Sequence, residues 1–292
     1  MSKMKQIILD NFVMGGTTPF VLIAGPCVIE DEAKTGEIAL FLKNLTGRLG
    51  IPFIFKASYD KANRTSKDSY RGPGFTKGIA ILRDIKKELG IPILSDVHRF
   101  EEIEGAAKVL DVVQVPAFLC RQTDLIIEIA RKARCINIKK GQFLAPWDVA
   151  NILAKASSTG NENIMITERG TSFGYNNLVV DFRALPIMRE MGYPVVFDAT
   201  HSVQLPGGAG RASGGQREMV PYLSRAAVAV GIDGIFLEVH PNPERALCDG
   251  PNTLSFDSLS DLLCTLKEID EVVKRAPNVR TPSKLSSILI PR

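Results

Sequence analysis

Short runs of apolar residues alternate along the chain with longer stretches in which apolar positions recur at helical spacing. The short runs are rich in Val, Ile and Phe, which is typical of strands buried on both faces of a parallel sheet. They cover residues 20–24, 53–56, 93–96, 112–115, 136–139, 164–167, 195–198 and 235–238. Helical spacing occurs at residues 76–89, 99–110, 123–133, 146–157 and 257–274. The pattern predicts repeated units of a strand followed by a helix.

The number of alternations favours a closed barrel over an open sheet. An open doubly wound sheet needs only about five or six strands, whereas about eight strands with intervening helices are typical of the α/β class called the (β/α)8 TIM barrel. The chain has 292 residues, and about 200 to 250 suffice for one such barrel. No linker or low-complexity stretch divides it, so residues 1–292 are predicted to form a single domain. Residues 5–14 precede the first strand and are expected to form a short N-terminal hairpin under the barrel.

Composition and charge narrow the class of protein. The net charge is only +4, and no block of Lys or Arg is long enough to predict a nucleic-acid-binding arm. No stretch approaches the roughly 20 apolar residues of a membrane span, and the apolar run near the N-terminus is too short for a signal peptide. We therefore expect a cytoplasmic protein whose partners include neither nucleic acid nor a membrane. The 5 cysteines are scattered, so they are expected to be free thiols or metal ligands.

Basic side chains gather at the predicted carboxyl ends of the strands, where barrel enzymes place their active sites. Lys56 and Lys139 end the second and fifth strands, Arg169 follows the sixth, and Lys61 lies in the loop after the second. Facing one mouth, these charges would repel one another, and a phosphorylated substrate would resolve that conflict. The pattern predicts an anion site, with solvated charges at the rim as the alternative. Other polar groups at or just beyond strand ends are Asp96, Gln114, Arg121 and Asp198.

A second set of residues has the chemistry of metal ligands. Cys27, His201 and Glu238 lie at the ends of the first, seventh and eighth strands, and Asp249 lies in the loop after the eighth. Taken singly, each has an ordinary structural explanation. A closed barrel, however, puts the eighth strand beside the first, with the seventh next to it, so these groups are predicted to share one corner. Sulfur, nitrogen and carboxylate donors suit Zn, Fe or Mn better than Ca or Mg.

Two histidines and a glycine-rich stretch leave alternatives open. His98 and His240 are alternative ligands, although His98 follows the third strand and is better suited to a structural or substrate-side role. Glycines cluster at 206–210 and 213–215 without the G-x-G-x-x-G spacing of a dinucleotide site. No organic cofactor is therefore expected, and a mobile loop over the site at 207–215 is the preferred interpretation.

Residues 22–252 resemble the 3-deoxy-octulosonate 8-phosphate synthases. The resemblance is carried by long segments, among them Ile-Ala-Gly-Pro-Cys at 23–27, Asp-Lys-Ala-Asn-Arg at 60–64, Pro-Ala-Phe-Leu-Cys-Arg-Gln-Thr-Asp at 116–124 and Asp-Ala-Thr-His-Ser at 198–202. The sister family, the 3-deoxy-heptulosonate 7-phosphate synthases, shares the barrel and acts on erythrose 4-phosphate. It typically has a Lys-Pro-Arg-Thr-Ser type loop after the second strand. This chain has the octulosonate form, with Asn63 in the loop and Thr65 where that family more often has Ser.

The resemblance implies an activity and roles for these residues. The family joins phosphoenolpyruvate, arabinose 5-phosphate and water into 3-deoxy-octulosonate 8-phosphate and releases inorganic phosphate, and the product feeds lipopolysaccharide. By resemblance, phosphoenolpyruvate is held by Lys61, Lys139 and Arg169, with Lys56 and Gln114 nearby. The aldose phosphate is held by Asn63, Arg64 and Thr65. The resemblance also implies that Arg121 reaches the aldose phosphate of a neighbouring subunit. The protein is therefore expected to form a homo-oligomer, namely a homotetramer.

The resemblance also bears on catalysis and on the metal. It implies a divalent metal (Zn, Fe or Mn) on Cys27, His201, Glu238 and Asp249, because metal-independent members carry Asn in place of the cysteine. Catalytic roles are expected for Lys61, Asp96, His201 and Asp249. The group that handles the proton of the attacking water stays open between Asp96, Asp198 and a metal-bound water. The alternatives are the heptulosonate synthase, a metal-dependent class II aldolase on the same barrel, and a phosphosugar-binding module without catalysis.

Overall fold

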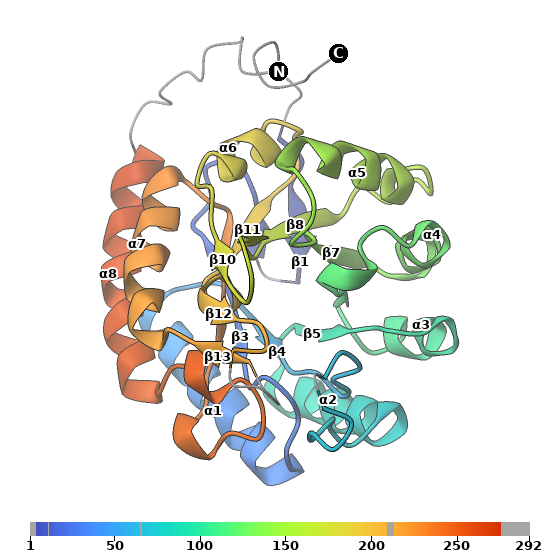
Figure 1. The fold of residues 1–292 in the computed structure, drawn as a ribbon, viewed down its shortest axis with the longest axis vertical. Coiled ribbons are helices and arrows are strands. Elements are labelled where there is room, and N and C mark those ends of the chain that lie inside the picture. The colour runs from blue at the N-terminus through green and yellow to red at the C-terminus, as the bar shows by residue number, and fades with distance from the viewer. Residues whose placement is uncertain (1–3, 11, 65, 209–212, 276–292) are drawn as a thin grey trace.

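The computed structural model describes residues 4–275 apart from 11, 65 and 209–212. Parallel strands close into a barrel in the order β11-β14-β3-β4-β5-β6-β7-β8, with β8 pairing back to β11. Figure 1 shows the barrel with its helices outside. The barrel strands are β3 (Val21–Gly25), β4 (Phe53–Lys56), β5 (Ile93–Asp96), β6 (Val112–Val115), β7 (Cys135–Lys139), β8 (Ile164–Glu168), β11 (Val195–Asp198) and β14 (Gly234–Glu238). The predicted (β/α)8 TIM barrel is confirmed.

Helices form the outer layer of the barrel. They are α1 (Glu32–Leu49), α2 (Phe75–Leu89), α3 (Phe100–Ala107), α4 (Thr123–Lys132), α5 (Val149–Ser157), α6 (Ala184–Arg189), α7 (Val220–Val230) and α8 (Phe256–Arg275). The predicted helix at 146–157 starts instead with a short 3-10 turn, η2 (Pro146–Asp148), and the helix predicted at 99–110 ends at Ala107. The sequence pattern did not predict α1, α6 or α7.

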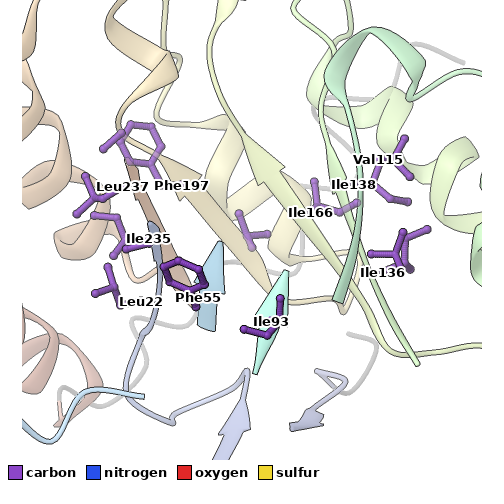
Figure 2. Packing of buried hydrophobic residues seen from close by; sticks show 14 of the residues in the cluster. Leu22, Phe55, Ile93, Val115, Ile136, Ile138, Ile166, Phe197, Ile235 and Leu237 are labelled. Carbon is purple, nitrogen blue, oxygen red and sulfur yellow. The ribbon is translucent and has the colours of Figure 1, made fainter. Parts of the chain in front are cut away.

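The interior of the barrel has an apolar lower layer and a polar upper layer. Inward positions of the lower layer form one buried cluster that includes Ile54, Leu94, Val112, Cys135, Met165, Val196 and Phe236. Outward positions pack against the helices, and Figure 2 shows this second cluster around Leu22, Phe55 and Ile235. Because side chains alternate along a strand, the next inward positions lie two residues further on. On β3 this position is Gly25. On the other strands it is buried and polar: Lys56, Asp96, Gln114, Asn137, Thr167, Asp198 and Glu238.

A hairpin closes the N-terminal end of the barrel. β1 (Ile7–Leu9) and β2 (Phe12–Met14) pair in antiparallel fashion. Ile7, Leu9 and Met14 are fully buried and belong to the lower interior cluster. The predicted N-terminal hairpin is therefore confirmed, and the polar chemistry of the interior faces the other end of the barrel.

Two small hairpins lie in the loops at the carboxyl ends of the strands. One pairs β9 (Thr171–Ser172) with β10 (Leu178–Val179), and the other pairs β12 (Gln204–Leu205) with β13 (Gly214–Gly215). The second hairpin frames the loop predicted to be mobile, of which residues 209–212 lie outside the described residues. Its closure over the site, and the single domain over 1–292, stay predictions. Among the described residues, no helix has the length and apolar character needed to cross a membrane.

Gly25 joins the first barrel strand to the site, and we expect Gly25→Ala to destabilise the fold. A Cβ there would lie 1.9 Å from the carbonyl oxygen of Lys56, so the backbones of β3 and β4 would have to separate. Such overpacking costs about 3 kcal/mol at the upper end of its usual range. Urea denaturation measures the loss of unfolding free energy. Gly36→Ala is the matched control, because its Cβ would meet nothing within 4 Å on α1 and should stabilise by up to about 1 kcal/mol. Equal stability of both variants would contradict the tight approach.

Candidate active site

A cavity of about 500 Å³ opens at the carboxyl ends of the strands. Polar and charged side chains from most of the barrel loops converge on it, as barrel architecture dictates. It is lined by residues of both predicted sets: Lys56, Lys61, Asn63, Arg64, Asp96, Gln114, Lys139, Arg169, His201 and Asp249. Further lining groups are His98, Gln142, Gln204 and Cys248.

Three of the predicted site residues that the structure describes are not among the lining residues of this cavity. Cys27 and Glu238 are buried at its edge, where each lies close to lining residues. Arg121 is exposed just before α4 and is not among the lining residues of its own subunit's cavity. Thr65 lies outside the described residues, so its predicted contact with the sugar phosphate stays a prediction.

The predicted metal ligands meet in one corner. The Cys27 Sγ lies 3.3 Å from Asp249 Oδ2. The Nε2 of His201 lies 3.6 Å from the same carboxylate and 3.7 Å from Glu238 Oε1. His201, Glu238 and Asp249 form one group whose ligand atoms lie within 4.8 Å of one another, and Cys27, Cys248 and Asp249 form a second group that shares Asp249. The closed barrel explains the meeting, because β14 pairs with both β3 and β11.

Asp198 orients the imidazole of His201. Its Oδ2 lies 2.8 Å from His201 Nδ1, and its Oδ1 accepts the backbone N–H of His201 at 2.9 Å. This arrangement places the ring proton on Nδ1 and leaves Nε2 facing Glu238 and Asp249. A carboxylate behind an imidazole is the usual support of a histidine that binds a metal. Burial opposes ionisation of Asp198, but His201 and Lys139 outweigh it and hold the pKa of this carboxyl far below its ordinary value.

Glu238 is both paired and available as a ligand. Its Oε1 accepts a hydrogen bond from the buried Lys56 at 2.9 Å, and Lys61 lies 3.8 Å away. Burial disfavours its charge, but Lys56 and His201 outweigh that effect and lower the pKa of Glu238. Its buried Oε2 has no hydrogen-bond partner among the described residues. An ionised carboxylate with an unpaired buried oxygen fits a cation, so the donor set fits a divalent metal.

The loop that carries Asp249 is held in a strained conformation. Asp249 has a φ of 48°, a left-handed value that few residues other than glycine adopt. The neighbouring Leu247 donates its N–H to Glu30 Oε1 at 2.8 Å, which ties the loop to the segment between β3 and α1. Strain of this kind is typical of functional sites. Cys248, beside Asp249, was not predicted as a site residue, and it accepts a hydrogen bond from Arg64 Nη1 at 2.9 Å.

The cationic side of the cavity is deeply buried. Lys139 donates to Asp198 at 2.7 Å, and Arg169 Nη2 donates to Gln204 Oε1 at 3.0 Å. Burial outweighs the neighbouring carboxylates and lowers the pKa of both Lys139 and Arg169. The buried Nη1 of Arg169 has no partner among the described residues. Both observations indicate that an anion in the cavity would relieve the desolvation of these cations.

Sequence reasoning missed the side chains that support the anion side. Gln204 connects the cationic side of the cavity to the metal corner. Its Oε1 accepts from Arg169, and its Nε2 donates to Asp249 Oδ1 at 3.3 Å. Glu168 Oε1 accepts the backbone N–H of Gly170 at 2.7 Å, and Glu168 Oε2 lies 3.5 Å from the ammonium of the buried Lys140. No sequence signal marks Gln204, whereas the pairs at 139–140 and 168–169 are visible at the strand ends.

The fold and the site define an enzyme of the (β/α)8-barrel class with a cationic cavity beside a candidate metal corner. Residues 3–275 match the family described as the DAHP synthetase I family, and the chain belongs to this family. Two similar proteins, from Geotalea daltonii and Geotalea uraniireducens, are 62% and 63% identical over 270 residues, which is 92% of this chain and 99% of theirs. A protein from Desulfosudis oleivorans is 63% identical over 264 residues, covering 90% of this chain and 95% of its own. All three carry the name 2-dehydro-3-deoxyphosphooctonate aldolase.

Proposed function

We propose that this protein condenses phosphoenolpyruvate with arabinose 5-phosphate and water to give 3-deoxy-octulosonate 8-phosphate and inorganic phosphate. The observation that carries the proposal is the cavity itself, in which buried Lys and Arg side chains adjoin a Cys, His, Glu and Asp corner. The near-full-length relatives support it, because their name refers to the aldol bond of the same eight-carbon phosphate. Asn63, which lines the cavity, favours the five-carbon sugar over erythrose 4-phosphate.

Phosphoenolpyruvate is assigned to the deep cationic half of the cavity. Lys61, Lys139 and Arg169 would hold its phosphate and carboxylate, since all three are buried and line the cavity. Gln114 lines the same cavity. Lys56 has a more indirect role, because its ammonium already donates to Glu238 Oε1 and to the carbonyl oxygen of Cys27, each at 2.9 Å. It would neutralise the charge of Glu238 rather than bind the substrate directly.

The aldose phosphate is assigned to the outer half. Asn63 is exposed and Arg64 half-buried at the rim of the cavity, and Thr65 adjoins them in the same loop. We assign Arg121 to the sugar phosphate of a neighbouring subunit, because it is exposed and lies outside its own cavity. This assignment requires a homo-oligomer, for which we propose a homotetramer in the cytoplasm.

The protein is proposed to belong to the metal-dependent branch, with Cys27, His201, Glu238 and Asp249 as ligands. A bound divalent ion would orient and polarise the sugar aldehyde as a Lewis acid. Asp198 would keep His201 in the tautomer that presents Nε2. The ion is Zn, Fe or Mn by the nature of the donors.

The side chains then support a condensation in which C3 of phosphoenolpyruvate attacks the aldehyde carbon. Positive charge develops at C2, water adds there, and the tetrahedral intermediate expels phosphate. Lys61, Lys139 and Arg169 hold the phosphate charge in a preorganised site. Lys56 and Lys61 help to hold the pKa of Asp96 far below its ordinary value despite its burial. Asp96 is thus ionised and lines the cavity, but so low a pKa makes it a weak base. The candidate acceptors for the proton of the attacking water are therefore Asp96, Asp198 and a water held by the metal.

The proposal is tested by phosphate release from phosphoenolpyruvate, with arabinose 5-phosphate and erythrose 4-phosphate assayed in parallel. We expect release with the five-carbon sugar and a kcat/KM at least about fivefold lower with the four-carbon sugar, because a mispaired polar contact costs about 1 to 3 kcal/mol. Preference for the four-carbon sugar would assign the chain to the heptulosonate activity. Binding of both substrates without release would support the binding-module alternative, and cleavage of a bisphosphorylated sugar would support the class II aldolase.

A further inference from the structure

A chain of buried hydrogen bonds crosses the polar layer of the barrel interior. Thr167 Oγ1 on β8 donates to Asn137 Oδ1 on β7 at 2.7 Å, and Asn137 Nδ2 donates to Gln114 Oε1 on β6 at 2.8 Å. Gln114 Nε2 in turn donates to Asp96 Oδ1 on β5. The other carboxylate oxygen of Asp96 accepts from Ser58 at 2.7 Å. The chain therefore links consecutive strands and ends on a carboxylate in the cavity.

The ionised carboxylate fixes the direction of every bond in this chain. A carboxylate only accepts hydrogen bonds, so Gln114 must turn its NH₂ group toward Asp96. Its oxygen then faces Asn137, which must also present an NH₂ group. The oxygen of Asn137 is left facing Thr167, whose hydroxyl must donate. Reversing any one amide would place two acceptors or two donors against each other in a buried layer, which is costly.

Only one end of the chain reaches the cavity. Asp96 and Gln114 line it, whereas Asn137 and Thr167 are fully buried and do not. We infer that Asn137 and Thr167 are positioning residues that lock the carboxamide of Gln114, and through it the Asp96 carboxylate, in the phosphoenolpyruvate half of the site. This inference rests on the proposed function. It extends that function to two residues from which no substrate contact is expected.

The charges around Asp96 explain why its position would matter for substrate binding. The charged or titratable groups that act on Asp96 include Lys56, Lys61, Lys139 and His98. A free Gln114 side chain could turn its oxygen toward Asp96 or toward the cavity, and Asp96 would then shift toward the lysines that hold the substrate phosphate. Loosening the chain should therefore weaken the binding of phosphoenolpyruvate more than that of the aldose, because Arg64 donates to Asn63 and to Cys248 rather than to a member of this chain.

Asn137→Asp tests the direction of the chain through pH. An ionised carboxylate at 137 only accepts, so it would compete with Asp96 for the NH₂ group of Gln114. A protonated carboxyl at 137 instead donates to Gln114 Oε1 and accepts from Thr167, which reproduces the native pattern. Burial and the nearby Asp96 raise the pKa of the new carboxyl, so both forms occur between about pH 5 and 9.

The measurement is the KM for phosphoenolpyruvate of this variant divided by that of the native protein across that pH range. We expect a ratio of about ten at pH 8.5 that falls toward one near pH 5.5, with the aldose KM ratio constant. A ratio that does not change with pH would overturn the inference, since a purely structural role has no reason to follow this titration. A native protein without phosphate release would instead count against the proposed function.

Thr167→Val and Thr167→Ser give a second test that needs no new charge. Valine matches the shape of threonine but cannot donate, whereas serine keeps the hydroxyl. We expect the KM for phosphoenolpyruvate to rise about fivefold in Thr167→Val, with kcat within twofold of native, and to return to within twofold in Thr167→Ser. Native kinetics in Thr167→Val, or an equal defect in both variants, would overturn the inference even if Asn137→Asp fails to fold.

Discussion

Removal of divalent cations is expected to lower phosphate release by about a thousandfold, and Zn, Fe or Mn should restore it. The expectation follows from the corner in which Cys27, His201, Glu238 and Asp249 meet, where one carboxylate oxygen of Glu238 has no hydrogen-bond partner in the described part of the chain. Loss of Lewis-acid stabilisation is worth several kcal/mol, and about 4 kcal/mol corresponds to this factor. The measurement compares chelated and reconstituted protein in the phosphate assay. Full activity in metal-free protein would refute the metal-dependent assignment.

Cys27→Asn separates the ligand from the fold in the same experiment. We expect metal content to fall well below one ion per subunit, because an amide is a poor replacement for a thiolate. Some metal-independent activity should persist, since the metal-independent branch carries Asn at this position. Cys264→Ser is the matched control, because Cys264 is an exposed thiol on α8. Unchanged metal content in Cys27→Asn, measured by elemental analysis, would show that Cys27 is not a ligand.

Arg169→Ala is expected to raise the KM for phosphoenolpyruvate at least about thirtyfold. The guanidinium is buried and lines the cavity, and its Nη1 has no hydrogen-bond partner within the part of the chain that the structure describes. Truncating one partner of a buried, charge-assisted pair costs about 2 to 5 kcal/mol, which sets this lower limit. Arg169→Lys should recover little, because an ammonium does not reproduce the two-pronged geometry of a guanidinium.

The control for this variant is Arg183→Ala, since Arg183 is exposed and pairs with the nearby Asp181. Its steady-state kinetics should match those of the native protein. The separate KM values for the two substrates decide where Arg169 acts. A rise confined to the aldose phosphate would show that the two halves of the cavity have been assigned the wrong way round.

The barrel was predictable because its strands are buried on both faces and give an unbroken apolar signal. Closure of the barrel was enough to bring Cys27, His201 and Glu238 to neighbouring strand ends. The missed α6 is only six residues long and contains Pro186, so it shows little helical periodicity. α1 was also missed, although Ile38, Leu42 and Leu45 form a buried stripe. Such a stripe is the ordinary signal of a helix that packs on a sheet, so α1 was predictable from the sequence.

The hydrogen-bond partners of the site residues could not be predicted from the sequence. Nothing in the order of residues indicates that Lys56 pairs with Glu238, 182 positions away, or that Gln204 lies between Arg169 and Asp249. Such contacts depend on side-chain reach across the barrel rather than on spacing along a strand. Lys56 was predicted as a substrate ligand, and two of the three N–H donors of its ammonium bond to Glu238 and to the Cys27 carbonyl. Its contact with a substrate stays a prediction.

The N-terminal hairpin has a consequence for molecular traffic. Ile7, Leu9 and Met14 pack into one end of the barrel, so the cavity is closed at that end. Reactants and products would therefore pass through the same opening at the carboxyl ends of the strands. With phosphoenolpyruvate at Lys139 and the sugar at Asn63, as proposed above, phosphoenolpyruvate would have to enter before the sugar. The eight-carbon product, larger than either reactant, must leave along the path by which the sugar arrived. Release of product through this opening would then limit the rate of turnover.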